Sequence, residues 1–374
     1  MKGVYRDTEW SKHKKRRGFT IIELLIVVVV IAILAAITVV SYNGITGQAK
    51  EAALKSDLRN AATQLNAHRI SDGGDFPSIK PGYVGDNLNY FGSAQNFCVF
   101  GEVNNRTFYA DEDGNIREGV CPPPVTMQAM TPGYCVLMPV YTGSNPEAVL
   151  SLTDNRGGTV RNYEVAKLAD NKCWMLTNLK LGSTSSTIPL TPADSSVASN
   201  FTLPQLSTSW TGAVTPVAWG PVTGDTGVGA TNYGYLYNWS AATSGASEAD
   251  MPAGSGNAPY SICPFGWRLP TSGNGGDFSV LNAKMNNPSA TTGSSGSGPG
   301  FFENWQSDGR FKGTFSGSRT TTFSGQGSWG RIWSSTASTT DARYAYYASI
   351  AADNISPAVT IYRVQGHAVR CVLN

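Results

Sequence analysis

The sequence has 374 residues, of which only 14% are charged and 41 are glycine, and its formal net charge is +2. This composition is typical of a loop-rich β protein outside the cytoplasm and does not fit a cytosolic enzyme. Of the 28 basic and 26 acidic residues, seven and two lie within residues 1–18, which leaves 21 against 24, or about −3, in the rest of the chain. No basic patch indicates a nucleic-acid partner, so DNA binding is not expected.

A basic cluster and a glycine precede a long apolar run that contains one carboxylate. The cluster ends at Arg17, Gly18 follows, and the run extends from Phe19 to Val40 with Glu23 inside it. As a helix, residues 19–40 span about 33 Å, which matches a hydrocarbon core of about 30 Å. The basic cluster predicts a cytoplasmic N-terminus. A carboxylate in a spanning helix costs roughly 2.5–3.5 kcal/mol, so Glu23 requires a partner.

This arrangement resembles the class III signal of type IV pilins and pseudopilins. The resemblance implies that a prepilin peptidase removes a leader of residues 1–18 by cleaving after Gly18 and methylates the new N-terminus, Phe19. It also implies that Glu23 pairs with the freed amino group of Phe19 on a neighbouring pilin subunit of a helical filament. The precursor is then expected to cross the inner (cytoplasmic) membrane once, and the mature subunit to lie in an extracellular pilus at the cell surface.

Two other interpretations of the apolar run are weaker. A secretory signal peptide cleaved near Ala35 disagrees with the length of the run and with a glycine that precedes it. A plain single-pass anchor leaves Glu23 unexplained. We therefore expect the pilin-type signal.

The periodicity beyond the membrane run predicts that the helix continues. No proline occurs from Phe19 to Ile70, so one helix over residues 19–71, about 75 Å long, is expected. Gly44 and Gly47 mark a weak point where a bend or local melting is expected, since each costs nearly 1 kcal/mol relative to alanine. Residues 71–74 should end the helix. Its apolar stripe recurs at i, i+4, i+7 and i+11: Leu54, Leu58, Ala61 and Leu65.

Residues 72–121 are expected to form a small head that packs on the outer half of this helix, because about 50 residues cannot bury a core alone. Residues 107–117 predict a hairpin with Asp113-Gly114 at the turn. Asp111, Asp113 and Asn115 also resemble the start of a calcium loop. That pattern fails at Ile116, where glycine is required, and no glutamate closes it. A turn is favoured over a metal site, and no metal or other cofactor is expected.

A proline-rich stretch, residues 122–132, is expected to be an extended linker before a second domain at 133–374. Three blocks in that domain, 163–179, 262–271 and 366–372, resemble in order the Fibrobacter succinogenes major paralogous domain, over roughly 135–374. That domain looks like a relative of the C-type lectin-like and formylglycine-generating-enzyme folds. The resemblance implies a compact α+β module with short strands and long irregular loops, so the predicted fold class of the chain is α+β.

All six cysteines lie beyond the membrane run, and an even count outside the cytoplasm predicts up to three disulfides. Cys98 and Cys121 bracket a strand–turn–strand pattern, and closing that loop should contribute roughly 3 kcal/mol. The resemblance to the broader fold implies a Cys263–Cys371 bridge and leaves Cys135 with Cys173. Free thiols are the alternative if the cell lacks oxidising machinery.

Eight of the nine tryptophans lie in the second domain. Trp174, Trp267 and Trp333 occupy strand-like blocks and are predicted to be core residues. The other five adjoin loops rich in Gly, Ser and Thr and are candidates for stacking on a glycan or other cell-surface ligand. The alternative, that they pack loops against the core, is favoured. These five are Trp210, Trp219, Trp239, Trp305 and Trp329.

No enzyme is expected. His68 and His367 have no serine or cysteine partner by motif, and residues 286–300 lack the Gly-Lys-Ser/Thr ending of a phosphate-binding loop. The sequence predicts a minor or tip subunit of a type IV pilus that displays an adhesion module. The alternatives are a pseudopilin of a type II secretion or DNA-uptake machine and a major pilin that forms the shaft.

Overall fold

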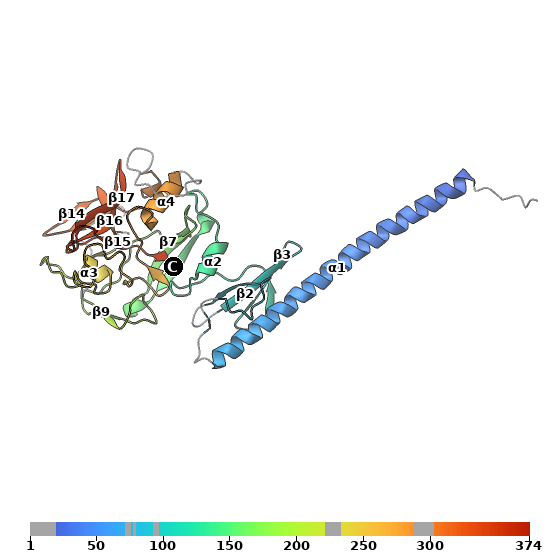
Figure 1. The fold of residues 1–374 in the computed structure, drawn as a ribbon, viewed down its shortest axis with the longest axis horizontal. Helices are drawn as coiled ribbons and strands as arrows, with labels where there is room; N and C mark the ends of the chain where they lie inside the picture. Colours follow the sequence, from blue (N-terminus) through green and yellow to red (C-terminus); the bar gives the residue numbers. More distant parts are fainter. Residues whose placement is uncertain (1–19, 72–75, 78–79, 93–96, 221–232, 287–302) are drawn as a thin grey trace, which may run out of the picture.

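The computed structural model describes residues 20–71, 76–77, 80–92, 97–220, 233–286 and 303–374 (Figure 1). The cleavage positions Gly18 and Phe19 lie outside these residues. The chain has a long N-terminal helix, a small β head and a larger α+β module, which confirms the predicted fold class.

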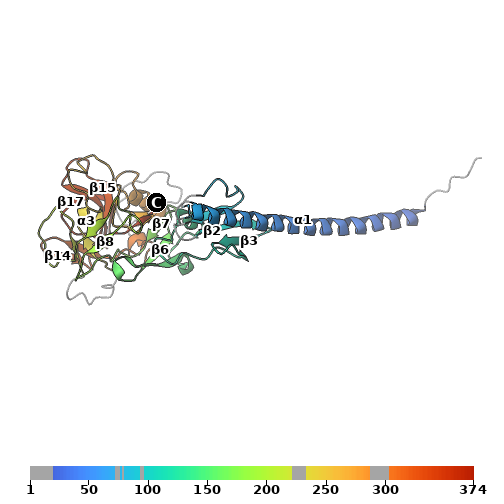
Figure 2. The same ribbon diagram turned by 90° about the horizontal axis from the view of Figure 1, so that it is seen from below.

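Helix α1 spans Ile21–Ser71, 51 residues, and ends at the predicted breaker (Figures 1 and 2). It continues through Gly44 and Gly47 without interruption, so the expected local melting is absent from the single chain. Each glycine weakens the helix by about 1 kcal/mol, and the segment that follows Gly47 is rich in alanine, lysine and glutamate, which are strong helix formers.

The head is a four-stranded antiparallel sheet that packs on the outer half of α1, as predicted. The strands follow chain order, β1-β2-β3-β4, and are Asn89–Gly92, Phe97–Val103, Arg106–Asp111 and Ile116–Glu118. The apolar stripe of α1 forms one core with the sheet, in which Leu58 and Leu65 are completely buried beside Val99 and Phe108. The helix and the sheet share this core, which neither of them could form alone.

The predicted hairpin at 107–117 is present as β3 and β4. Gly114 adopts a positive φ of 71°, and its N–H donates to the Asp111 carbonyl at 2.9 Å, which closes the turn. The Arg117 guanidinium binds the carboxylates of both Asp111 and Asp113. The acids that began the calcium-like pattern are therefore neutralised by an arginine.

The predicted boundary at residue 133 is wrong. Met127 and Met130 are buried in the core of the C-terminal module, and the Met127 N–H donates to the Thr153 carbonyl at 2.8 Å. Only the prolines at 122–124 lie between the head and this core, so we define the module as residues 125–374. The proline composition predicted a spacer, but the methionines that follow are core residues.

Helix α2, Pro132–Leu137, lies where the head meets the module. Thr131 caps it by accepting from the Tyr134 N–H at 3.2 Å. The Tyr134 ring packs edge-on against Phe91 of β1, with centroids 5.6 Å apart. The head therefore contacts the module directly as well as through the chain.

The first sheet of the module brings the two ends of its sequence together. Its order is β12-β18-β7-β6-β5, all antiparallel, so that the last strand lies beside an early one (Figure 1). The strands are β5 Val149–Asp154, β6 Arg161–Lys167, β7 Cys173–Met175, β12 Trp267–Arg268 and β18 Val372–Leu373.

The second sheet, in the order β14-β13-β15-β16-β17, is antiparallel except for the β13–β15 pair. The block 366–372 crosses the centre of the module between the sheets, because Gly366, His367 and Ala368 form backbone bridges to three separate segments. The strands are β13 Ser316–Arg319, β14 Phe323–Gln326, β15 Trp329–Ala337, β16 Tyr344–Ala351 and β17 Ile355–Tyr362.

Short elements complete the module. Helix α4, Asp277–Asn286, faces the core with Phe278, Leu281 and Met285, which recur at i, i+3 and i+7. The others are α3 Trp239–Ala242, the strand pairs β8 Ile188–Leu190 with β9 Phe201–Leu203 and β10 Ala218–Trp219 with β11 Leu236–Tyr237, and the 3-10 turns η1 Pro146–Ala148, η2 Arg156–Gly158 and η4 Glu303–Trp305.

Three disulfides join all six cysteines, which confirms their predicted number. The bonds are Cys98–Cys121 in the head and Cys135–Cys173 and Cys263–Cys371 in the module. The pairings agree with the strand pattern of the head and with the resemblance of the module.

Candidate functional site

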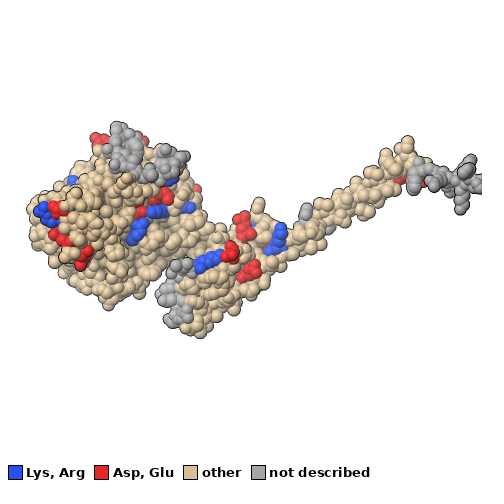
Figure 3. All heavy atoms as spheres, in the orientation of Figure 1, with Lys and Arg blue, Asp and Glu red and all other residues tan. Residues whose placement is uncertain are grey.

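The inner half of α1 is the first candidate site, because it is apolar and packs against no other part of the chain that the structure describes. It is long and apolar enough to cross a membrane, and its most apolar 18-residue window buries nothing against the rest of the protein. Figure 3 shows this half free of basic side chains, with mixed charge returning where the head covers the helix. A surface of this kind requires lipid or other helices around it.

Glu23 lies at the N-terminal end of this surface and is engaged within its own helix. Its Oε2 accepts from the Thr20 N–H at 2.9 Å and from the Thr20 hydroxyl at 2.8 Å, and the Glu23 N–H donates to Thr20 Oγ1 at 3.2 Å. This reciprocal arrangement is a capping box, which satisfies N–H groups that the first helical turn leaves free.

Thr20 is a residue that the sequence reasoning missed, although its signal was readable. The pattern Thr-x-x-Glu before an apolar run is the sequence signature of a capping box. The predicted pairing of Glu23 with the Phe19 amine of a neighbour is not tested in a single chain. The box gives the carboxylate a partner before any neighbour arrives.

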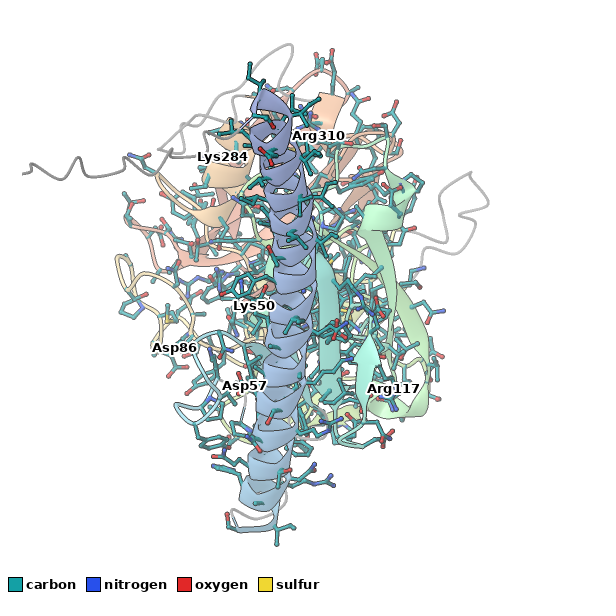
Figure 4. The ribbon with its side chains drawn as sticks, turned by 90° about the vertical axis from the view of Figure 1, so that its right-hand side faces the viewer. Lys50, Asp57, Asp86, Arg117, Lys284 and Arg310 are labelled. Carbon is teal, nitrogen blue, oxygen red and sulfur yellow. A yellow bond between two sulfur atoms is a disulfide. The ribbon has the colours of Figure 1, made fainter. Side chains whose placement is uncertain are left out.

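The outer half of α1 carries charged residues that contact the head. Glu51 binds both Lys55 of its own helix and Arg106 of β3, and Arg106 also binds Glu118. On the opposite side of the helix Asp57 accepts from the Asn87 amide at 2.9 Å; Figure 4 shows Asp86 on that side and Arg117 on the other. The contacts of Arg106 and Asn87 hold the head to the helix.

Three of the five tryptophans proposed for ligand stacking are core residues, so those predictions are wrong. Trp219, Trp239 and Trp305 are at most 1% exposed. Each indole N–H donates within the protein: to the Ser209 carbonyl at 2.9 Å, to the Ser334 carbonyl at 2.9 Å and to the Asn282 side-chain oxygen at 2.8 Å. They anchor loops to the core, which was the favoured alternative.

Trp174, Trp267 and Trp333 are fully buried, as predicted. The remaining two candidates, Trp210 and Trp329, are half-buried, and Trp329 is the first residue of β15. The Trp329 ring carries the Arg331 guanidinium 4.1 Å from its centroid, and Trp210 packs beside the second core cluster. Both rings have protein on at least one face, and their role as ligand platforms stays a prediction.

Buried arginines perform a second loop-anchoring role that the sequence did not reveal. Arg370 is fully buried, makes no ion pair with another described residue, and donates to Asn178 Oδ1 at 2.7 Å and to two backbone carbonyls. Burial lowers the pKa of Arg370 to about 9. Arg363 lies 4.2 Å over the Trp239 ring and donates to three carbonyls, including that of Met251 at 2.7 Å. Guanidinium donors thus satisfy carbonyls that short strands leave free.

One of the two histidines considered in the sequence is a core residue. His367 is fully buried between Trp333 and Tyr347, and neither ring nitrogen has a hydrogen-bond partner within the described part of the chain. Burial, with the nearby charge of Arg331, lowers its pKa well below the usual value. The described residues also contain no group of three His, Cys, Asp or Glu side chains that could hold a metal ion.

Comparison with known families identifies both ends of the chain. Residues 13–39 match the prokaryotic N-terminal methylation motif, and residues 169–373, more than half of the chain, match the Fibrobacter succinogenes major domain. No curated protein and no solved structure matches the chain at a significant level. Both predicted resemblances are confirmed, and likeness to C-type lectins stays a prediction. The match starts at 169, although β5 and β6 before it complete the first sheet.

Proposed function

Because the chain belongs to the Fibrobacter succinogenes major domain family and is a type IV pilin-like protein by its methylation motif, we propose that it is a minor or tip subunit of a type IV pilus. In this proposal α1 assembles the subunit into the filament and the module at 125–374 acts outside the cell as an adhesion module. The module has a binding role and no catalytic one.

The observation that carries the proposal is the inner half of α1. It presents an apolar surface of membrane-spanning length with one carboxylate, Glu23, which lies within the methylation motif at residues 13–39. The surface suits the inner membrane before assembly and a bundle of identical helices afterwards. Processing by a prepilin peptidase and assembly with other pilin subunits follow from the motif.

The size of the module favours a minor or tip position over a major pilin. The head alone covers the outer half of α1, and about 250 further residues lie beyond it (Figure 1). A repeat of this bulk at every position would crowd a shaft built on closely packed helices. A pseudopilin of a secretion or DNA-uptake machine stays the rival, in which the module would contact other parts of the machine.

Substitutions of Glu23 test the assembly step. Glu23→Ala should leave cleavage and methylation of Phe19 intact, as read by mass spectrometry, and should remove the subunit from sheared filaments. Glu23→Gln is the sharper variant, because glutamine can serve in a capping box but carries no charge. We expect it to fail in assembly as well. Normal incorporation of Glu23→Gln would show that only the helix cap matters and would refute charge pairing between subunits.

Two further variants complete this experiment. Thr20→Val removes the capping hydroxyl and keeps the carboxylate, so it should assemble far better than Glu23→Gln. Glu51→Gln removes a carboxylate from the outer half of α1, where it contacts Lys55 and Arg106, and should assemble normally. Incorporation is measured as the ratio of this chain in sheared filaments to that in membranes.

The composition of purified filaments tests the position of the subunit. A minor or tip subunit should form a small fraction of filament mass and should be seen by immunogold labelling at few sites or at one end. Dominance of the chain by mass would overturn the tip assignment, and absence from every extracellular filament would favour the pseudopilin.

A further inference from the structure

An open cavity of about 570 Å³ lies at the end of the module away from α1. Its walls come from the segment that enters β9, from the turn after α3 and from the loop at 250–260. Figures 1 and 2 both place α3 on the side of the module opposite to α1. The volume falls within the range typical of small-molecule sites, about 300–1,000 Å³.

Two aromatic rings form the apolar part of this cavity. Tyr260 is 45% exposed, the most exposed tyrosine of the described module. Phe201 is half-buried, and its ring lies against the backbone of Gly245, where an added Cβ would come within 3.4 Å. Gly245 has a φ of +102°, which other residues rarely adopt. The floor is therefore a ring seated on bare backbone.

Polar groups without protein partners surround the rings. The side chains of Ser199, Asn200 and Ser244 line the cavity, and none makes a hydrogen bond to another described residue. Asn200 offers both an acceptor and two donors, and the hydroxyls can do either. Such groups are free to bind a ligand.

The acidic side of the cavity is held in place. Asp250 Oδ2 accepts from the Ser247 N–H at 2.9 Å and from the Ser247 hydroxyl at 2.7 Å. Buried Arg363 donates to the carbonyl of Met251, which also lines the cavity, at 2.7 Å. The loop that carries Asp250 is thus pinned to the core, and the site is pre-organised.

The charge of the lining limits the class of ligand. The lining has one carboxylate, Asp250, and no lysine, arginine or histidine. A phosphate, sulfate or carboxylate would find no basic partner here and would be repelled. An exposed ring, a half-buried ring, amide and hydroxyl groups and one carboxylate match the alternating apolar faces and hydroxyl edges of a sugar. A peptide strand fits less well, because β9 has only three residues to offer for pairing.

We propose that this cavity is a binding site for a neutral saccharide, with Tyr260 stacking on a sugar face and Asn200 and Asp250 bonding its hydroxyls. No metal is required. The site deepens the proposed function, since it gives the displayed module a ligand class, but binding itself does not depend on where the subunit sits in a filament.

Saturation-transfer NMR on the full chain tests the proposal. The chain is kept in a zwitterionic detergent without a sugar headgroup, since maltoside detergents would compete. The neutral probes are cellobiose, lactose and N,N′-diacetylchitobiose, and sialyllactose is the acidic counterpart of lactose. At least one neutral probe should bind saturably, and sialyllactose should bind less well than lactose.

Variants locate the binding. Tyr260→Ala should weaken the affinity for the bound probe about 10-fold and Asn200→Ala about fivefold, while Tyr260→Phe keeps most of it. Tyr83→Ala, at an exposed tyrosine of the head, is the matched control and should change nothing. Melting temperatures of all four should stay near that of the unchanged chain, because the altered side chains are exposed or lie at the surface.

Three outcomes overturn the proposal: no binding of any neutral probe, preference for sialyllactose, or binding that Tyr260→Ala and Asn200→Ala leave unchanged. Each is distinguishable from failure of the pilin assignment. Tyr260→Ala subunits should still enter filaments, whereas Glu23→Gln subunits should still bind the sugar and fail only in assembly.

Discussion

The inner half of α1 and the C-terminal module differ in the exposure of their apolar residues. From Ile21 to Ile37 the large apolar side chains are 47–85% exposed, while six of the eight tryptophans of the module are at most 1% exposed. The helix leaves its contacts to be made by lipid and by other subunits. The module completes its contacts within itself, so it can be carried to the surface as a finished unit.

The polar groups of the two regions differ as well, in how far away along the chain their hydrogen-bond partners lie. The helix has one carboxylate in its apolar half, and a single neighbour, Thr20, satisfies it. The module buries several arginines, and each donates to carbonyls of loops far away in sequence, such as Arg370 to Phe311 and Lys312. Local capping suffices for a straight helix, whereas a fold with few long strands needs side chains to bind its loops.

The largest expected effect comes from removing the disulfide that closes the longest loop, which tests whether the module folds independently of the head. Cys263 and Cys371 are 108 residues apart, and a loop of that length restricts the unfolded chain by about 4–5 kcal/mol. The Cys263→Ala/Cys371→Ala pair should lower the free energy of unfolding by that amount. Denaturant titration followed by tryptophan emission measures it, since every tryptophan beyond residue 18 lies in the module.

The head provides the control for this measurement. Its Cys98–Cys121 bond spans only 23 residues, so loss should cost roughly 3 kcal/mol of head stability. The tryptophan transition should barely move in Cys98→Ala/Cys121→Ala. If it shifted as far as in the module variant, head and module would unfold together and the module would not be self-contained.

The second test separates anchoring tryptophans from half-buried ones. Trp239→Ala should cost about 3–5 kcal/mol, because it opens a cavity in the core and removes the ring under Arg363. Trp329→Ala should cost less than about 1 kcal/mol, since solvent already reaches this ring. Thermal unfolding by circular dichroism compares the two. Equal losses would contradict the assignment of Trp239 as an anchor of the core.

Regular patterns were predictable from the sequence because they depend on neighbours in the chain. The stripe through Leu58 and Leu65 repeats at helical spacing, and Asp113-Gly114 supports a turn by local chemistry. For Trp239, burial was only the favoured one of two interpretations, because local spacing could not decide between them. Its hydrogen bond reaches Ser334, 95 residues away, and no local spacing encodes such a contact.

The sequence did not predict the boundary of the module or its cavity, and the reason is the same for both. Three prolines before Val125 predicted a spacer, and only the pairing of Met127 with Thr153 shows where the core begins. The cavity combines Asn200, Gly245 and Tyr260 from separate loops. Long-range contacts decide both, so the resemblance to a family predicted the fold class and pairings but not the site.

The third test uses the buried His367. Its folded pKa lies well below the ordinary value of about 6.5, so below that pH the unfolded chain takes up a proton that the folded chain excludes. Stability should therefore fall as the pH drops, by about 2 kcal/mol between pH 6.5 and 5. His367→Phe should remove this loss, as measured by denaturant titration at each pH.

The experiment on His367 needs a control for Asp170, because Asp170 changes the stability with pH in the opposite direction. Burial raises the pKa of Asp170 to about 6, so its folded form gains a proton first and stability rises as the pH falls below 6. Asp170→Asn removes that gain. The difference between the unchanged chain and His367→Phe, measured in the Asp170→Asn background, isolates the histidine. A difference that does not change with pH would contradict the neutral buried imidazole.

The smallest effect concerns α1 at Gly44, near the end of its apolar half. An added Cβ at Gly44 would meet nothing within 4 Å, so Gly44→Ala should strengthen α1 by about 1 kcal/mol through propensity alone. Amide exchange around residue 44 should slow about fivefold in the subunit in detergent.

Incorporation into filaments decides what the glycine is for. If assembly requires the helix to open there, Gly44→Ala should assemble less well although it is more stable. If the helix stays intact, as in the single chain, assembly should be unchanged or better. The inner half of α1 would then be a rigid helix that needs other molecules only to cover its exposed apolar side chains. The module has its large apolar side chains mostly buried, and this is the difference between the two regions.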